Sequence, residues 1–506
     1  MSQLPRIESL LVLGGGSAGL LAALTLKRKI PALRVEVVYS SKIGVIGVGE
    51  GTTPYVPAHV HQYLGFDEHE VFQEIQPVYK LGIRFEWGRA THFDYTFTQQ
   101  QQSFRKKGLA RNHGFYHEDP TTPLDLSSAL MGKRKALPLR ADGVPDVPPP
   151  GTVLAWHIEN KLFVSWLEKK CRSIGVLFTD AELTATDLDE HGEISAIHLS
   201  TGERKSADLY VDCSGFASEL LGVARREPFK EFGDSLFCDR AVVGGWDRED
   251  EQVLPYTTSD TMQCGWCWRI DHLERIHRGY VFSSTHLSDE LAVEEYSAVS
   301  PKARNPRIVE FRSGSYQRSW IGNTIAIGNA AGFVEPLEAT ALMVICLQSR
   351  WLADGLIDCE QQPSKSLVGL YNGLNQRLWE DIKCFLALHY RFNDRIDNEF
   401  WRRCHHEIPL GQVENIVEFY RENGPSAIAG GLLGSNDPFG LDGYLAILGG
   451  LKVPHLKPYS IPGKEGKIWT DLIADRKRIA ARALSMPQVV AHLNQPETWK
   501  QIRSRG

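Results

Sequence analysis

The sequence predicts a mixed α/β (α+β) fold with a Rossmann-type β-α-β start and a mostly helical C-terminal part. Three observations predict it. A glycine-rich turn separates an apolar strand from a helix near the N-terminus, strand-like segments with hairpin turns fill the middle of the chain, and helical spacing of apolar residues dominates from about residue 341. The 506 residues, 42% of them hydrophobic, are enough for a large core.

The first β-α-β unit carries a dinucleotide fingerprint. An apolar run at 10–13 is typical of a buried parallel strand, a helix is expected over about 18–29, and a second strand over 35–39. The turn between the first strand and the helix fits G-x-G-x-x-G, which lets a backbone approach a pyrophosphate at a helix N-terminus. The expected cofactor contacts in this turn are Gly14, Gly16, Ser17, Ala18 and Gly19. The strand–turn–helix–strand context argues against a chance glycine cluster.

The second strand lacks the acidic residue that usually holds a ribose at this position. Glu36 lies within the strand, and Tyr39, Ser40 and Ser41 occupy its end. We therefore expect backbone atoms or Ser40 to meet the ribose.

FAD fits the chain better than NAD. A glycine-studded loop covers 44–54, and small-residue turns follow strands at 212–215 and 328–332. Turns spread so widely along the chain indicate one long cofactor, although each later turn alone also fits ordinary strand-end geometry. The expected FAD contacts in these turns are Gly49, Glu50, Gly328, Asn329 and Gly332.

Composition excludes some classes of function. The net charge of −6 comes without a basic block, which argues against a nucleic-acid partner. The apolar segment 10–26 contains three consecutive glycines, and no other run approaches membrane length, so we expect a cytoplasmic protein without membrane contact. Nine cysteines without framework spacing fit a reducing compartment.

We expect no metal site. Cys264 and Cys267 form a C-x-x-C, but no second C-x-x-C completes a zinc site, and the segment resembles an aromatic strand. Cysteine, histidine and glutamate types also adjoin one another at 404–407, but adjacent residues of a helix point in different directions.

The chain divides into two expected regions. Residues 1–345 form the cofactor-binding part, interrupted at about 91–152 by a polar, irregular insertion or mobile loop, and 346–506 form a mostly helical covering part. Within the first region a helix is expected at 157–173. A hairpin-rich antiparallel sheet is expected from strands near 176–179, 183–188, 194–199 and 209–211.

The chain resembles the flavin-dependent tryptophan halogenase family, most clearly in 9–90, 205–221, 262–285 and 320–395. Besides the fingerprint, four features carry the resemblance. They are G-V-G-E at 47–50, W-x-W-x-I at Trp266, Trp268 and Ile270 with Asp271 in place of the family's proline, the stretch 332–340, and Lys80 where the family keeps an essential lysine.

The resemblance implies a flavin monooxygenase-like FAD-binding box whose flavin and substrate sites are joined by a tunnel. It implies that reduced FAD, O2 and chloride or bromide give hypohalous acid, which travels to a lysine and halogenates an electron-rich aromatic such as indole or an indole derivative. The implied catalytic residues are Lys80 and Glu338, the halide contacts Thr340 and Ala341, and the tunnel or substrate residues Trp266, Trp268 and Pro336. Phe400 and Trp401 are candidates for stacking on the substrate ring, although core packing fits them equally well.

These residue types also fit plainer roles. A lone lysine is normally at the surface, Glu338 at a helix start fits a dipole-favoured cap, and paired tryptophans on a strand fit a core. A flavin-dependent aromatic hydroxylase of the same fold and a non-enzymatic flavoprotein are the alternative functions.

The expected partners are a small aromatic substrate and a flavin reductase. The sequence has no second dinucleotide fingerprint, so a separate reductase would supply FADH2, as the resemblance also implies. The segment 424–450 is rich in Gly, Ala and Leu where family members that act on free tryptophan close a lid with tyrosines and a carboxylate. We therefore expect an open site for indole or for a larger or carrier-bound aromatic.

Overall fold

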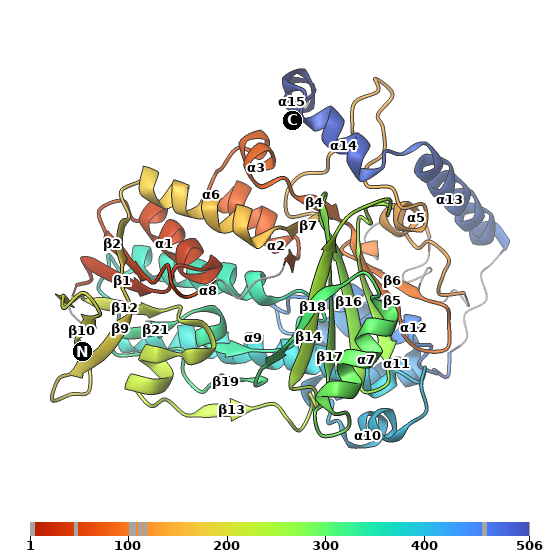
Figure 1. Cartoon of the computed structure of the whole chain (residues 1–506). Helices are drawn as coiled ribbons and strands as arrows, with labels where there is room; N and C mark the ends of the chain where they lie inside the picture. Colours follow the sequence, from red (N-terminus) through yellow and green to blue (C-terminus); the bar gives the residue numbers. More distant parts are fainter. Residues whose placement is uncertain are drawn as a thin grey trace.

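A computed structural model describes residues 6–44, 49–100, 108–109, 115, 119–457 and 463–504. One part of the molecule is built on a six-stranded sheet in the order β20-β21-β12-β1-β2-β8 (Figure 1). All neighbouring strands in it are parallel except β20 and β21. The strands are β1 (Ser9–Leu13), β2 (Arg34–Tyr39), β8 (Leu177–Asp180), β12 (Leu209–Asp212), β20 (Trp320–Ile321) and β21 (Thr324–Ala326).

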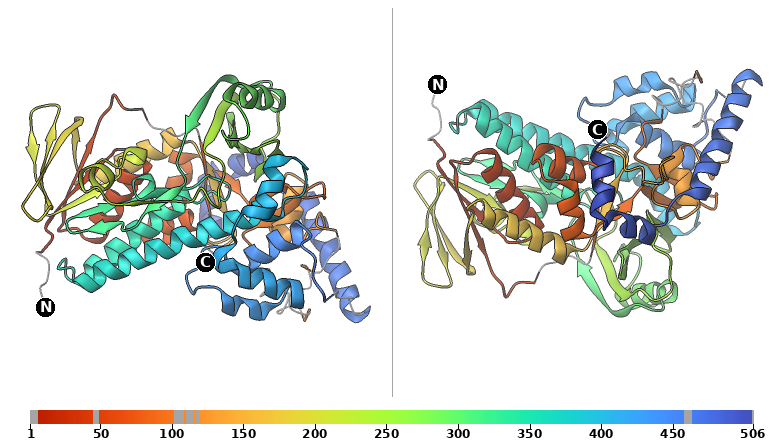
Figure 2. Two further views of the ribbon diagram at one scale, coloured as in Figure 1. Left: turned by 90° about the horizontal axis from the view of Figure 1, so that it is seen from below. Right: turned by 90° about the horizontal axis from the view of Figure 1, so that it is seen from above.

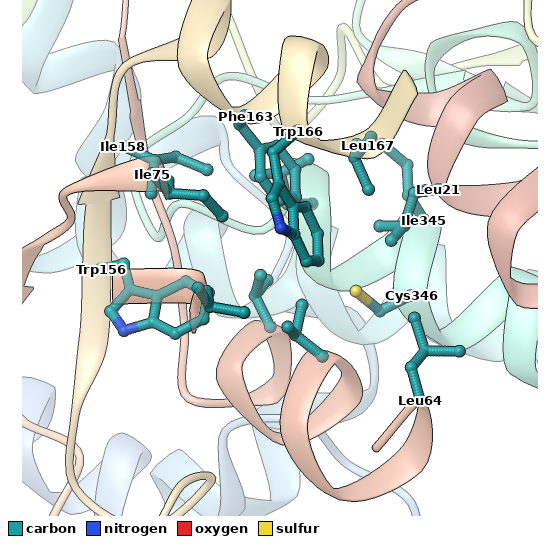
Figure 3. Packing of buried hydrophobic residues seen from close by; sticks show 14 of the residues in the cluster. Leu21, Leu64, Ile75, Trp156, Ile158, Phe163, Trp166, Leu167, Ile345 and Cys346 are labelled. Atoms are coloured by element: carbon teal, nitrogen blue, oxygen red, sulfur yellow. The ribbon is translucent and has the colours of Figure 1, made fainter. Parts of the chain in front are cut away.

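Alternating side chains bury both faces of this sheet. Leu10 and Val12 of β1 pack toward helices α1 (Ser17–Lys29), α6 (Asn160–Ser173) and α8 (Ala341–Asp358). Figure 3 shows part of this core, where Trp166 of α6 lies among Leu21, Ile345 and Cys346. Leu11 and Leu13 pack instead toward a small antiparallel sheet of β9 (Leu183–Leu188), β10 (Ile194–Leu199) and β11 (Arg204–Lys205). This sheet, the helices on one face and the small sheet on the other therefore form a three-layer box.

A second, seven-stranded sheet has the order β18-β14-β17-β16-β15-β5-β6. Its strands are β5 (Gly82–Glu86), β6 (Phe93–Thr96), β14 (Arg240–Asp247), β15 (Thr257–Met262), β16 (Gly265–Asp271), β17 (Arg275–Phe282) and β18 (Arg304–Glu310). Three-stranded sheets complete the strand content. They contain β3 (Glu50–Gly51), β7 (Ala155–Ile158) and β4 (Val78–Lys80), and β13 (Phe229–Glu231), β19 (Gly314–Tyr316) and β22 (Gly332–Phe333).

Helices dominate the described chain after β22. The longest, α9 (Lys365–Phe392), has 28 residues and runs from the first sheet toward the second (Figure 2, left). Besides α8, the others there are α10 (Glu399–Glu407), α11 (Glu414–Asn423), α12 (Gly440–Gly450), α13 (Gly463–Arg482), α14 (Met486–Leu493) and α15 (Pro496–Arg503). Shorter helices before β22 are α2 (Tyr55–Pro57), α3 (Glu68–Ile75), α5 (Leu126–Gly132) and α7 (Asp289–Val299). The division of the chain at residue 345 stays a prediction.

Short helical turns link these elements. They are η1 (Ala58–Tyr63), η3 (Gly215–Ala217), η4 (Glu219–Ala224), η5 (Gly328–Ala330), η6 (Gly411–Val413) and η7 (Ala427–Leu432). None of the helices in the described ranges is long and apolar enough to cross a membrane.

Three expectations for local structure were wrong in part. The segment 91–152 is not simply irregular. It contains β6, which pairs with β5, and α5, which begins with a capping box at Asp125. The helix expected from residue 157 begins at Asn160, because the two residues before Glu159 belong to β7. The strands near 177–180 and 209–212 join the parallel sheet, and only β9 to β11 form the expected hairpins.

Candidate active site

Lys80 ends β4 and is fully buried, so it is not the surface lysine that its residue type alone suggests. Its Nζ donates to the Thr52 carbonyl oxygen at 3.0 Å and lies 5.5 Å from the centre of the Phe97 ring. Burial lowers the pKa of Lys80 to about 7, while the carboxylate of Glu338 acts in the opposite direction. Near neutral pH a large share of this amine is therefore uncharged.

Glu338 is also buried, just ahead of α8. Its Oε1 lies 2.8 Å from His389 Nε2, and His389 Nδ1 lies 2.7 Å from the carbonyl oxygen of Phe385. The proton on Nδ1 is donated to that carbonyl, so Nε2 of a neutral imidazole carries no proton. The contact between Nε2 and Glu338 Oε1 therefore needs one proton, which the imidazole and the carboxyl group share. Burial raises the pKa of Glu338, while His389 and Lys80 act to lower it. The carboxylate thus hydrogen-bonds to His389 and does not cap α8.

Gly51 of β3 lies between Lys80 and the residue that follows Glu338. A Cβ atom at Gly51 would lie 3.4 Å from Lys80 Nζ and 3.4 Å from the Cβ of Ala339, the neighbour of Glu338. The charges of Lys80 and Glu338 also shift each other's pKa. The structure therefore brings the two predicted catalytic side chains into one buried region.

The N-terminus of α8 follows Glu338 directly in the chain. Thr340 is the buried N-cap residue, Ala341 is exposed, and the first intrahelical bond runs from Val344 N to the Thr340 carbonyl at 2.9 Å. The amides of Ala341 and the next two residues precede that bond and have no acceptor within the helix. Ala339 has a φ of +54°, a strained value for alanine that turns the chain between Glu338 and the helix.

The fingerprint glycines form a tight cradle. A Cβ at Gly14, whose φ is +123°, would lie 2.3 Å from the Cys213 carbonyl oxygen, and one at Gly19 would lie 1.9 Å from the Gly14 carbonyl oxygen. A Cβ at Gly328 would lie 3.1 Å from Ala18, so the first and third predicted turns adjoin. This cradle fits the pyrophosphate of a dinucleotide spanning both turns.

Gly16, Ser17 and Ser40 are three more of the predicted cofactor residues. Gly16 has open space where a Cβ would stand, and Ser17 Oγ donates to Asn160 Oδ1 at 2.8 Å. Ser40 lies at the end of β2 near Glu182, with its Oγ 3.4 Å from Glu182 Oε1. Glu36 is engaged by Lys205 Nζ at 2.5 Å. The contact of Ser40 with a ribose stays a prediction.

Two further turns carry the other predicted contacts. Glu50 pairs with Ile158 in β3 and β7, and burial raises its pKa to about 7. Asn329 lines a surface groove together with Phe216 and Phe333, and Gly332 begins β22 beside Gly314. Gly49 is described, whereas residues 47 and 48 of the G-V-G-E motif lie outside the described residues. The FAD contacts of all these residues stay predictions.

The sequence model of the tryptophan halogenase family matches residues 9–458. The chain belongs to this family. Tryptophan 7-halogenase KtzQ of Kutzneria sp. (strain 744) is 34% identical over an alignment length of 454, and the match covers 83% of this chain and 83% of KtzQ. Tryptophan 6-halogenase ThaL of Streptomyces albogriseolus is 30% identical over an alignment length of 452, and the match again covers 83% of each chain. The resemblance inferred from the motifs is confirmed.

Solved structures agree in fold. The lathipeptide tryptophan 5-halogenase MibH superposes with a TM-score of 0.86 at 32% identity, covering 98% of this chain and 95% of MibH. BrvH, a flavin-dependent halogenase from Brevundimonas sp. BAL3, gives 0.82 at 27% identity, covering 97% and 99%. The predicted mixed α/β fold is confirmed, the protein is a flavin-dependent halogenase, and the hydroxylase alternative is not favoured.

In this halogenase the paired tryptophans are core residues. Trp266 and Trp268 share one face of β16 with Ile270, while Cys267 points to the opposite face. Trp266 Nε1 donates to Glu335 Oε1 at 3.0 Å, and the ring of Trp268 covers Gly279. The alternation follows the two-residue period of a strand. Their expected place along a tunnel stays a prediction, as does that of Pro336, which is exposed.

Phe400 and Trp401 of α10 belong to the same core. Trp401 stacks on Tyr390 with ring centres 5.7 Å apart, and its Nε1 donates to the Met262 carbonyl at 2.9 Å. Tyr390 in turn donates to Glu335 at 2.6 Å. Stacking of either aromatic on a substrate stays a prediction.

Sequence reasoning missed several residues of this site. His389 and Thr52 are the direct partners of Glu338 and Lys80, and Phe97 faces the amine. Glu335 is buried between Trp266 and Tyr390, and burial raises its pKa to about 7. No local pattern marks these residues, because their partners lie far away in the chain.

Proposed function

We propose that this enzyme halogenates an indole ring carried by a substrate larger than free tryptophan, with Lys80 and Glu338 as catalytic residues. The proposal rests above all on the buried amine of Lys80 beside the Glu338–His389 pair. Bound FAD in its reduced form, supplied by a separate flavin reductase, provides the chemistry that turns O2 and halide into hypohalous acid.

Lys80 receives the oxidant. Its uncharged amine attacks the halogen of hypohalous acid, so that an N–halogen bond forms, the O–halogen bond breaks and water leaves. The lowered pKa makes the uncharged form available near neutral pH. The indole ring then attacks the halogen held on Nζ.

Glu338 moves the protons of this step. The proton shared by Glu338 and His389 passes to the departing Lys80 nitrogen, and the Glu338 carboxylate then accepts the proton that the halogenated ring loses. Both partners are restored after each turnover. His389 is a positioning residue, since it acts through Glu338.

The halide is expected at the N-terminus of α8. The free amides after Thr340 and the positive end of the helix favour an anion at this point. The alanine at position 341, where the family usually has glycine, keeps the amide donor.

The 424–450 segment supports a large substrate. Its Tyr444 donates to Asp437 at 2.9 Å, so each is engaged within the segment instead of holding an amino acid. Phe439 stacks on Phe385, the residue whose carbonyl accepts from His389, so the segment borders the catalytic pair. Exposed apolar side chains nearby, Ile428 and Leu456, offer contacts for a peptide or carrier. Similarity to MibH, whose name specifies a lathipeptide tryptophan, agrees with this.

A substrate panel tests the proposal. The enzyme is supplied with FAD, a flavin reductase, NADH and either chloride or bromide, and is offered indole, free tryptophan and tryptophan-containing peptides. Mass spectrometry should show one hydrogen replaced by halogen in peptides, with weaker product from free tryptophan. Saturable turnover that favours free tryptophan over every peptide would refute the substrate class.

A further inference from the structure

Three metal-capable side chains meet away from the catalytic pair. Glu159 stands at the N-cap of α6, directly after β7, His272 directly follows β16, and His277 lies in β17. One ligand atom from each lies within 4.8 Å of the others. The β16–β17 hairpin thus presents two imidazoles to one carboxylate.

Within the described residues, the facing atoms of this cluster have no hydrogen-bond partners. Nε2 of His272, Nε2 of His277 and Oε1 of Glu159 are each buried without one. His277 Nε2 approaches Glu159 Oε1 to 3.5 Å without forming a hydrogen bond, and the two imidazoles are 3% and 7% exposed. Buried polar atoms left unpaired destabilise a fold, so three of them at one point indicate a ligand.

The three side chains are of the right chemical types for a cation site. Imidazole and carboxylate groups bind metal ions in their deprotonated forms.

We infer that Glu159, His272 and His277 form a binding site for a divalent transition metal, with Zn²⁺ as the best fit. Two imidazole nitrogens and one carboxylate oxygen match a tetrahedral zinc ion that keeps its fourth position for water. Ca²⁺ and Mg²⁺ fit less well because they prefer oxygen ligands.

The turn that carries His272 is fixed independently. Asp271, fully buried, binds Arg248 at 3.0 Å and Arg269 at 2.7 Å, and Arg248 also donates to the His272 carbonyl at 2.7 Å. A pre-positioned ligand loses less entropy when the metal binds. Asp271 stands where the family motif has proline, and its ion pairs hold this turn in place.

The site would join the β16–β17 hairpin to the start of α6 near the active site. A Cβ at Gly49 would lie 2.3 Å from His272 Nε2, and β7 pairs with both Glu50 and Lys80. A metal joining His272 and His277 to Glu159 would therefore hold the hairpin against the strand that supports Lys80.

Metal analysis of the purified full-length chain tests this inference. After chelator treatment and dialysis against zinc, mass spectrometry of the metal should find about one zinc ion per chain. Zinc should also raise the melting temperature, because it binds the folded state. Glu159→Gln and the double variant His272→Gln, His277→Gln should lose zinc affinity by at least about 100-fold. The exposed His406→Gln is the matched control and should bind zinc like the wild type.

Cobalt gives a second measurement on the unmutated chain, which removes any dependence on how the variants fold. Cobalt(II) bound by two imidazoles and a carboxylate should show the visible absorption of a four-coordinate ion. Zinc content no higher than in the double variant, absence of that absorption, or displacement of zinc by FAD would each overturn the metal site.

Discussion

At the scale of single residues, burial of Lys80 lowers the free energy of unfolding at neutral pH but makes its amine more reactive. Its folded pKa of about 7 lies below its unfolded value near 10.4, so between these values the unfolded chain holds a proton that the folded chain lacks. The free energy of unfolding therefore rises with pH over this range. Removing the amine should stabilise the protein at neutral pH.

We predict that Lys80→Met raises the free energy of unfolding by about 3 kcal/mol at pH 7, after about 1 kcal/mol is lost with the hydrogen bond to Thr52. The gain should nearly vanish at about pH 10, where the unfolded lysine also begins to lose its proton. Denaturant unfolding at both pH values measures this. The exposed Lys161→Met should change stability at neither pH, and an equal gain at both would contradict the assigned pKa shift.

His389 should set the protonation of Glu338. His389→Phe keeps an aromatic ring against Phe85 but removes the hydrogen-bond partner, so the pKa of the buried Glu338 should rise further. We predict a kcat lower by about 100-fold or more and a pH profile of kcat shifted to higher pH. His389→Gln, which can still donate to Glu338, should recover part of the rate. An unshifted profile in His389→Phe would show that the histidine only packs.

At the scale of elements, the N-terminus of α8 should bind halide through its amides. Ala341→Asp places a carboxylate where helix dipoles favour one, so the helix should stay intact while the side chain competes with halide. We predict a chloride KM raised about tenfold or more, with Ala341→Asn changed by less than about threefold. Steady-state kinetics over a chloride series measures both. Equal effects of Asp and Asn would place the halide elsewhere.

Elements with a strong local pattern were predictable from the sequence. The β1-α1-β2 unit combines a buried apolar strand, three glycines and a helix, so local patterns alone specify it. β6 was not predictable, because a short polar-flanked segment becomes a strand only by pairing with β5. The contact of His389 with Glu338 spans 51 residues and has no local signal. The Glu159–His272–His277 cluster likewise depends on tertiary packing.

At the scale of the whole molecule, α9 connects cofactor support with catalysis. Near its start Asn372 Oδ1 accepts from Trp320 N at the edge of the first sheet, and near its end His389 binds Glu338. Between them Asn375 binds Gln348 of α8, which accepts from Gly328 N in the cofactor cradle. One rigid helix therefore sets the distance between cradle and catalytic pair.

The exposed apolar residues Ile428, within 424–450, and Leu456, just after it, should matter only for large substrates. Ile428 is 72% and Leu456 77% exposed, so changing both to serine should leave folding intact. We predict that the double variant Ile428→Ser, Leu456→Ser raises KM for tryptophan-containing peptides about tenfold and leaves KM for indole unchanged. Parallel kinetics on both substrates measures the ratio. A matching rise for indole would mean that the segment shapes the ring site itself.

The mass of the product formed by Lys80→Ala decides the role assigned to the buried amine. Wild type, Lys80→Ala and the control Lys161→Ala are each given FAD, a flavin reductase, NADH, bromide and an accepted indole substrate. We predict that Lys80→Ala still consumes reduced flavin but yields brominated product at least about 1,000-fold more slowly, while Lys161→Ala matches the wild type. Brominated product from Lys80→Ala at the wild-type rate would contradict a catalytic role of the Lys80 amine.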